Sequence, residues 1–137
     1  MVAAAGSCGG VNKAEIERNR RLWHGSGIVN YRMTVDVQKT GHATPMGKFI
    51  IEVRDRQAVS IKMANDPTRD AMTERFALYD TIDDIFERIE VASVQRPDKM
   101  DIEYDPKLGY PKKLNLDPNT SAMDDELFFQ VLQFEAL

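Results

Sequence analysis

Hydrophobic and polar residues alternate with a period of two along several segments of this chain. In residues 28–39 every second side chain is apolar; these positions are Val29, Tyr31, Met33, Val35 and Val37. Residues 99–105 and 111–117 show the same alternation. Successive side chains of a strand point to opposite faces, so the pattern predicts strands with one face on a core and one in water.

Two further alternating segments, residues 48–54 and 58–63, predict a hairpin linked through Asp55 and Arg56. Their expected inward positions are Phe49, Ile51, Val53, Val59, Ile61 and Met63. Residues 64–80 then break the alternation, and Pro67 opposes regular structure. We expect a long loop there, which is a place where proteins often carry function.

Two other segments repeat apolar residues at spacings of three and four, which is typical of helices. Asn12 with Glu15 three residues later predicts a helix start, and the helix should end near Trp23, before two glycines. Thr81 is the expected cap of a second helix over residues 81–93. Its apolar stripe consists of Ile82, Ile85, Phe86, Ile89 and Ala92.

The last apolar segment, residues 125–137, is hydrophobic on both faces of a strand. Leu127, Phe129 and Val131 fall on one side, while Phe128, Leu132 and Phe134 fall on the other. Such a strand is either covered twice or meets a partner. Phe128 and Phe134 are therefore candidate contact residues, and a homodimer through this strand is one expectation.

The element order predicts an α+β fold in which two helices pack on an antiparallel sheet of about six strands, in the order α-βββ-α-βββ. A chain of 137 residues is the usual size of one domain. We expect that domain to cover residues 12–137, and residues 1–11 to be disordered and outside it.

The segment YDPKLGYPKKLNLD, residues 104–117, has an unusual concentration of turn residues. Asp105 and Pro106 suit the start of a turn, and Gly109 can supply a positive backbone angle. The first interpretation is a hairpin whose tip residues are dictated by backbone geometry. The alternative is that Tyr104, Asp105 and Tyr110 line a surface for a ligand or partner.

Composition and charge argue against several chemistries. The 18 basic and 22 acidic residues give a net charge of -4, which disfavours a nucleic-acid partner. Cys8, His24 and His42 have no zinc-ligand spacing, and a single cysteine forms no disulfide within the chain. No phosphate-binding glycine loop is present. We therefore predict no metal, no cofactor and no identifiable catalytic residue, and we expect the acidic face of residues 98–105 to be solvated.

The N-terminal sequence MVAAAGSCGG resembles the end of a bacterial lipoprotein signal, in which the cysteine is lipidated after cleavage. The basic start and most of the apolar run are missing. The alternative is a flexible leader with an incidental thiol at Cys8. Arg18, Arg20 and Arg21 on the first helix would form a solvated face or contact anionic lipid near the anchor.

The chain contains, in this order, Asn19-Arg20 with Trp23, Asn30-Tyr31, EVRDRQAVSI, YDTIDDIFERI and YDPKLGYPKKLNLD. Together these blocks resemble an uncharacterised bacterial family, domain of unknown function 6174, over about residues 15–135. The family implies a secreted or lipid-anchored protein, in agreement with Cys8, and it implies no catalytic residues. The sequence departs from the expected pattern at residues 55–57, where a glycine would suit the turn.

These observations predict a non-enzymatic binding module of the cell envelope, held at the membrane through Cys8. Its contacts would be an unidentified protein or small molecule at the last strand, at residues 64–80 or at the hairpin tip. A small hydrolase with acidic residues in a cleft and a protein inhibitor with a rigid exposed loop are the alternatives. If the N-terminus is as written, a cytoplasmic location is the alternative.

Overall fold

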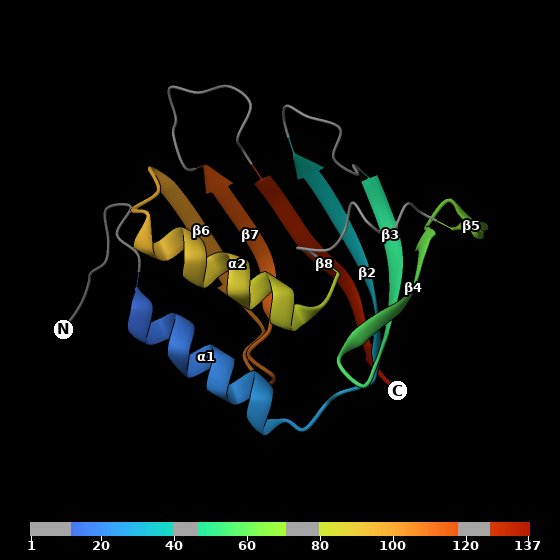
Figure 1. Cartoon of the computed structure of the whole chain (residues 1–137), viewed down its shortest axis with the longest axis horizontal. Helices are drawn as coiled ribbons and strands as arrows, with labels where there is room; N and C mark the ends of the chain where they lie inside the picture. The colour runs from blue at the N-terminus through green and yellow to red at the C-terminus, as the bar shows by residue number, and fades with distance from the viewer. Residues whose placement is uncertain (1–11, 40–46, 71–79, 118–126) are drawn as a thin grey trace.

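The computed structural model describes residues 12–39, 47–70, 80–117 and 127–137 (Figure 1). The helices are α1 (Lys13–Gly25) and α2 (Ile82–Val94). The strands are β2 (Tyr31–Lys39), β3 (Gly47–Arg54), β4 (Gln57–Met63), β5 (Asp66–Asp70), β6 (Lys99–Tyr104), β7 (Pro111–Asp117) and β8 (Leu127–Ala136).

The strands form one antiparallel sheet in the order β5-β4-β3-β2-β8-β7-β6. The predicted α+β architecture, with three strands before and three after the second helix, is confirmed. A short seventh strand, β5, adds to it at the edge beside β4, within the segment expected to be a loop. Pro67 is tolerated in β5 because an edge strand has one side with no ladder to join. Residues 71–79 of that expected loop lie outside the described residues.

The last strand, β8, lies inside the sheet between β2 and β7 and joins the two halves of the fold. Along Leu127–Gln130 it pairs with both neighbours. A homodimer through this stretch would therefore have to use side chains on the outer face of the strand rather than its backbone.

Both helices cover the same face of the sheet, where they lie side by side and antiparallel (Figure 1). Asn12 caps α1 by accepting a hydrogen bond from the Glu15 amide at 3.0 Å, and Thr81 caps α2 by accepting one from the Asp84 amide at 3.0 Å. The predicted apolar stripe of α2 is buried in the core. On α1, Ile16 and Trp23 are buried, whereas Leu22 is 42% exposed.

Two β-bulges change the face to which some apolar residues point. The β2–β8 register passes from Val35↔Val131 to Thr34↔Gln133, so Leu132 is an extra residue. Because an extra residue reverses the alternation beyond it, Phe134 faces the core opposite Met33. The prediction that Phe128 and Phe134 share a face is therefore wrong.

The second bulge lies in the hairpin of β3 and β4. Its register passes from Glu52↔Ser60 to Val53↔Ala58, which leaves Val59 as the extra residue. Val59 is 59% exposed, so its predicted inward position is wrong, and Ala58 packs against the core in its place.

Candidate functional site

Four aromatic rings hold the C-terminal half of α1 against the sheet. Phe134 stacks on Tyr110 with ring centroids 4.6 Å apart and on Tyr31 at 5.2 Å. Trp23 meets all three rings edge-on, at 5.4 to 6.1 Å. The structure thus places two predicted contact residues, Tyr110 and Phe134, beneath α1, where they join the helix to β2, β8 and the hairpin turn.

The hairpin turn between β6 and β7 lies against α1. Asp105 Oδ2 accepts hydrogen bonds from the backbone amides of Lys107 at 3.1 Å and Leu108 at 2.8 Å. Gly109 has a φ of +83°, and a Cβ atom there would lie 2.4 Å from the Asn19 carbonyl oxygen. This geometry supports the structural interpretation of the turn. If the protein is an inhibitor, the loop that enters the partner's cleft is a different one from the β6–β7 turn.

Tyr104 lies at the end of β6, where its ring stacks on Phe86 at 6.3 Å. Its hydroxyl oxygen is buried and has no hydrogen-bond partner among the described residues. Burial raises the pKa of this phenol above its usual value, so the group stays protonated. The structure therefore places Tyr104 partly buried on the helix-covered face, in contact with α2.

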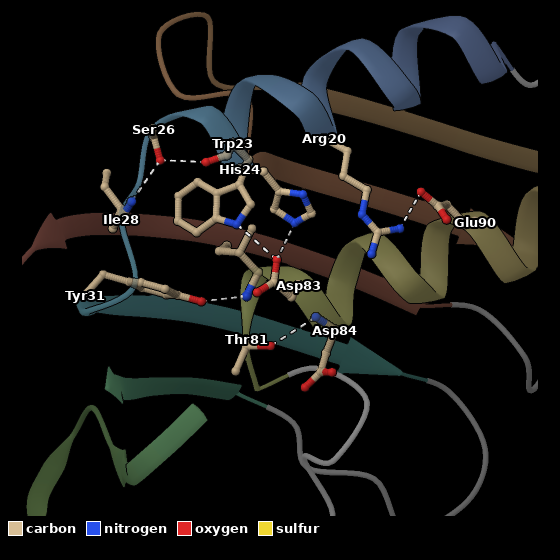
Figure 2. A network of polar contacts seen from close by, with 11 residues as sticks. Arg20, Trp23, His24, Ser26, Ile28, Tyr31, Thr81, Asp83, Asp84 and Glu90 are labelled. Carbon is tan, nitrogen blue, oxygen red and sulfur yellow. Dashed lines mark hydrogen bonds and ion pairs between the residues drawn. The ribbon is translucent and has the colours of Figure 1, made fainter. Parts of the chain in front are cut away.

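A polar network joins the end of α1 to the start of α2 (Figure 2). The Trp23 indole donates to Asp83 Oδ1 at 3.2 Å, and His24 Nε2 lies 3.1 Å from the same oxygen. The Tyr31 hydroxyl accepts a hydrogen bond from the Ile82 amide at 2.8 Å, and burial raises the pKa of this phenol. Carboxylates at a helix start complement the helix dipole.

A carboxyl pair, Asp80 and Asp84, lies at the same end of α2. Burial is the largest cause that raises the pKa of Asp80 from 3.8 to about 7, followed by its hydrogen bond with Asp84 and the charge of that residue. Asp80 therefore keeps its proton to a higher pH than an exposed carboxyl, which is a property that general acid–base catalysis uses. A raised pKa also arises in purely structural pairs.

An open cavity of about 200 Å³ lies between the start of α1 and the end of α2, lined by Lys13, Ile16, Glu17, Glu90, Ser93 and Val94. Sites for drug-sized ligands are usually about 300 Å³ or larger. This cavity is therefore too small to be the cleft of the predicted hydrolase alternative. Beside this cavity, an ion pair between Arg20 and Glu90 connects α1 with α2 (Figure 2).

No described helix or strand covers the other side of the sheet, which we call the outer face. Arg32 bridges Glu52 at 3.2 Å and Glu135 at 3.0 Å, and Arg54 also pairs with Glu52 at 3.0 Å. These two guanidinium groups, Arg54 first, lower the pKa of the Glu52 carboxyl. One end of the outer face is thus a ladder of alternating charges across β8, β2 and β3.

Phe128 also lies on the outer face, at the end of the sheet away from this ladder. It is in β8, between β2 and β7. It pairs with Gln38 on β2 and with Asn115 on β7. The Lys113 ammonium lies 5.9 Å from the centre of its ring, a cation–π distance. Of the predicted binding residues, Phe128 is the one that the structure leaves on a face without a helix.

Sequence reasoning did not single out Asp80, Asp83 or Trp23 as members of a polar network. The adjacent acids after Thr81 predicted a helix start, but their contact with α1 depends on tertiary packing. Cys8 and His42 lie outside the described residues. Within the described residues no cluster of three or more potential metal ligands occurs, and no helix is long and apolar enough to cross a membrane.

In the part of the chain that the structure describes, the fold is that of an α+β protein whose sheet carries both helices on one face and none on the other. The profile of the family of unknown function (DUF6174) matches residues 15–136, and the chain belongs to this family. Comparisons with curated proteins and with solved structures found no match.

Proposed function

We propose that this protein is a non-enzymatic binding module whose contact surface is the outer face around Phe128. The single observation that carries the proposal is the position of that ring. It lies on a central strand, on the face opposite the helices, with a lysine ammonium beside it.

The surroundings of Phe128 suit a contact surface. Aromatic residues supply much of the energy at protein interfaces, and polar groups around them supply hydrogen bonds. Gln38, Asn115 and Gln130 provide amide donors and acceptors next to the ring, and the charged ladder from Arg32 to Glu135 forms one border. A protein or small molecule with an apolar group and hydrogen-bonding neighbours would fit this arrangement.

The proposal also places the module in the cell envelope, tethered through a lipid on Cys8. The support is the pattern of small residues before this cysteine. Mass measurement of the protein from its native cells, with and without Cys8→Ser, tests the tether. We expect a lipid-sized mass on Cys8 and release of the variant into the soluble fraction; an unmodified thiol in membrane-free protein would contradict it.

Photo-crosslinking tests the contact surface. A benzoylphenylalanine at position 128 should capture a defined partner in native envelopes, whereas the same group at Leu22, which is exposed on the helix side, should not. Phe128→Ala and Lys113→Ala should weaken binding of the captured partner while the folded structure is kept. Equal capture at both positions, or binding unaffected by Phe128→Ala, would contradict the proposal.

A further inference from the structure

The two edges of the sheet differ in how they are protected against further pairing. β5 forms one edge; it is short, contains Pro67 and has an irregular register with β4. Natural proteins protect edge strands by such features. β6 forms the other edge, and among the described residues it pairs with β7 alone (Figure 1). It has no proline, and the extra residue of the β6–β7 bulge, Lys112, lies on β7. β6 is therefore regular enough to pair with another strand.

The backbone of β6 presents hydrogen-bonding groups to the outside of the sheet. The Asp105 amide donates to the Tyr110 carbonyl at 2.8 Å, so the backbone groups of Asp105 point toward β7. The direction of these groups alternates from residue to residue along a strand. The amides and carbonyls of Met100, Ile102 and Tyr104 therefore point away from β7. An extended peptide segment matches such a row of donors and acceptors.

The side chains of the same three residues lie on the helix-covered side of the sheet. Met100 is 8% exposed, and Ile102 and Tyr104 are partly buried against the core. The charges of α1 that act on Tyr104 are those of Glu15 and Arg18, which have opposite signs and form an ion pair at 3.9 Å. A strand added beside β6 would therefore continue an apolar row with its inward-facing side chains.

The outer side chains of β6 determine which charges suit a neighbouring strand. The outward-facing residues of β6 are all exposed and charged: Lys99, Asp101 and Glu103. None of them forms an ion pair within the part of the chain that the structure describes. Their cross-strand neighbours on β7 are, in the same order, Asp117, Asn115 and Lys113. Each charge of β6 thus has an opposite charge or a neutral amide on its inner side.

Opposite charges directly across from each other stabilise a sheet, and like charges destabilise it. On an antiparallel strand beside β6, the residues opposite Glu103 and Asp101 should therefore be basic, and the residue opposite Lys99 acidic. Read from its N-terminus, the strand has the pattern basic, apolar, basic, apolar, acidic. Lys113 and Asp117 have the same charges as the residues that this pattern places beside their β6 neighbours. They lie one strand further away, so they weaken the preference without reversing it.

A second copy of β6 matches this pattern less well. In the symmetric antiparallel pairing that places Lys99 opposite Glu103, the Asp101 side chains of the two copies face each other. A shift of the pairing by two residues places Asp101 opposite Glu103. Like charges meet in both registers, which is destabilising. The charges of β6 therefore favour a different, basic strand over a second copy of this chain.

We infer that the free edge of β6 binds an extended peptide segment of a partner protein as an additional antiparallel strand. The segment has apolar residues at alternate positions, basic residues opposite Asp101 and Glu103, and an acidic residue opposite Lys99. This surface is separate from the contact surface around Phe128, because β7 lies between β6 and β8. The inference goes beyond the proposed function and does not rest on it.

Hydrogen exchange in the free protein tests whether this edge is open. The amides of Met100 and Ile102 should exchange at least about tenfold faster than those of Asp101 and Glu103, which point toward β7. Slow exchange at every protein concentration would show that the edge is already covered. Exchange that slows as the concentration rises would assign the edge to a second copy of the chain. Either result would overturn the inference.

Synthetic peptides test the partner chemistry. The probe is the heptapeptide VKVKVEV with blocked ends, and its binding should slow the exchange of the Met100 and Ile102 amides. The reversed peptide VEVKVKV has the same composition, but in antiparallel pairing it places like charges opposite Lys99 and Glu103. It should bind about tenfold more weakly. Equal or tighter binding of the reversed peptide would refute the antiparallel register and overturn the inference.

N-methylated peptides test the backbone contact. In antiparallel pairing the residues directly opposite Met100 and Ile102 point their own amides toward β6. These residues are the two central valines of VKVKVEV, so methylation of their amide nitrogens should abolish binding. Methylation of the two lysine amides, which point away from β6, is the matched control and should leave binding in place. Equal loss with both methylated peptides would contradict the added strand.

Charge reversal in the protein completes the test. Asp101→Lys should weaken binding of VKVKVEV about fivefold, because a lysine then faces a lysine. Asp36→Lys makes the same change in charge on β2, three strands away from β6, and should leave binding unchanged. Phe128→Ala should also leave it unchanged, which separates this inference from the proposed function. Equal weakening by Asp101→Lys and Asp36→Lys, or loss of peptide binding in Phe128→Ala, would overturn the assignment to β6.

Discussion

The two faces of the sheet use aromatic residues in opposite ways. On the covered face Phe134 contacts three other rings and connects α1 with β2 and with the hairpin turn. On the outer face Phe128 contacts a lysine side chain and lies between polar cross-strand neighbours. The same residue type, six positions apart in one strand, therefore packs against other rings on one face and lies among polar side chains on the other.

This difference shows that a bulge decides which residues of a strand face the core and which face outward. Without the extra residue Leu132, Phe134 would fall on the outer face with Phe128, and the aromatic cluster would lose its central ring. The bulge thus places Phe134 beneath α1 and leaves Phe128 as the one aromatic ring on the outer face among the described residues. Substitutions on the covered face should change stability, and those on the outer face should change binding.

The largest expected effect is at Gly109, where the hairpin turn meets α1. In Gly109→Ala the new Cβ would lie 2.4 Å from the Asn19 carbonyl oxygen and 2.9 Å from the Leu22 Cβ. Helix and turn would have to separate, so we expect a loss of about 3 to 5 kcal/mol in the free energy of unfolding. Urea denaturation followed by circular dichroism measures it.

Gly27→Ala is the matched control for that substitution. Gly27 also has a positive φ, +72°, but a Cβ atom added there would meet nothing within 4 Å. We expect a loss of about 1 to 2 kcal/mol, which reflects the left-handed backbone alone. If both alanine variants lost the same stability, the close contact between the turn and α1 would be refuted.

The comparison of the two faces is tested directly by Phe134→Ala and Phe128→Ala. Removing Phe134 deletes the ring at the centre of the aromatic cluster, and we expect a loss of about 2 to 4 kcal/mol. Removing Phe128 should cost about 1 kcal/mol or less. Thermal unfolding of both variants under one condition gives the ranking. A reversed ranking would show that the outer face, not the covered face, depends on its aromatic ring.

Much of the fold follows from local signals in the sequence. The alternation in residues 28–39 correctly places Tyr31, Met33, Val35 and Val37 in the core. The stripe from Ile82 to Ala92 and the cap at Thr81 are also confirmed, because helix caps and apolar spacing depend on neighbouring residues. The order of elements then determines an antiparallel sheet covered by two helices.

The features of the fold that the sequence did not predict depend on interactions between distant segments. The bulges at Val59 and Leu132 carry no local signal, and each reverses the face of the residues beyond it. Strand β5 forms because β4 offers it a free edge, which its own sequence does not indicate. The same holds for the candidate sites. Phe128 lies on the opposite side of β8 from Phe129, as the alternation predicted, whereas Phe134 and Tyr110 were expected at a surface and lie beneath α1.

The start of α2 should respond to pH through Asp80. Its pKa is about 7 in the folded protein and 3.8 in an exposed carboxyl, so folding favours the protonated form. The stability linked to this proton is present at pH below about 4 and is lost as the pH rises to about 7. Asp80→Asn cannot ionise, so its stability should exceed that of the original chain at pH 8. The carboxyl is only half-buried and solvent screens it, which reduces the expected gain to about 1 kcal/mol.

Denaturation at several pH values measures this dependence. The difference between Asp80→Asn and the original chain should grow from pH 4 to pH 7 and then level off. Asp101→Asn, which removes an exposed carboxyl on β6, is the control and should show no such growth. A constant difference for Asp80→Asn over this range would mean that Asp80 and Asp84 do not share a proton in the folded state.

The smallest expected effect lies in the β3–β4 turn, away from both aromatic rings. Asp55 and Arg56 have φ values of 51° and 65°, which describe a two-residue hairpin turn that favours asparagine or aspartate followed by glycine. The Asp55 amide donates to the Asn30 side chain at 2.8 Å, and the Arg56 amide donates to the Val29 carbonyl at 2.9 Å. Contacts with the chain after α1 thus hold the turn without a glycine.

Arg56→Gly should therefore stabilise the protein slightly. Glycine removes a left-handed strain of about 1 to 2 kcal/mol, and its greater freedom in the unfolded chain cancels about 0.5 to 1 kcal/mol of that gain. The net increase should be about 0.5 kcal/mol, measurable as a shift in the urea midpoint. Gln57→Gly, one residue further on and in β4, should lower stability instead. If both glycines were destabilising, the hydrogen bonds that the Asn30 side chain and the Val29 carbonyl accept from the turn would already offset the strain at Arg56. Glycine would then add no stability to this turn.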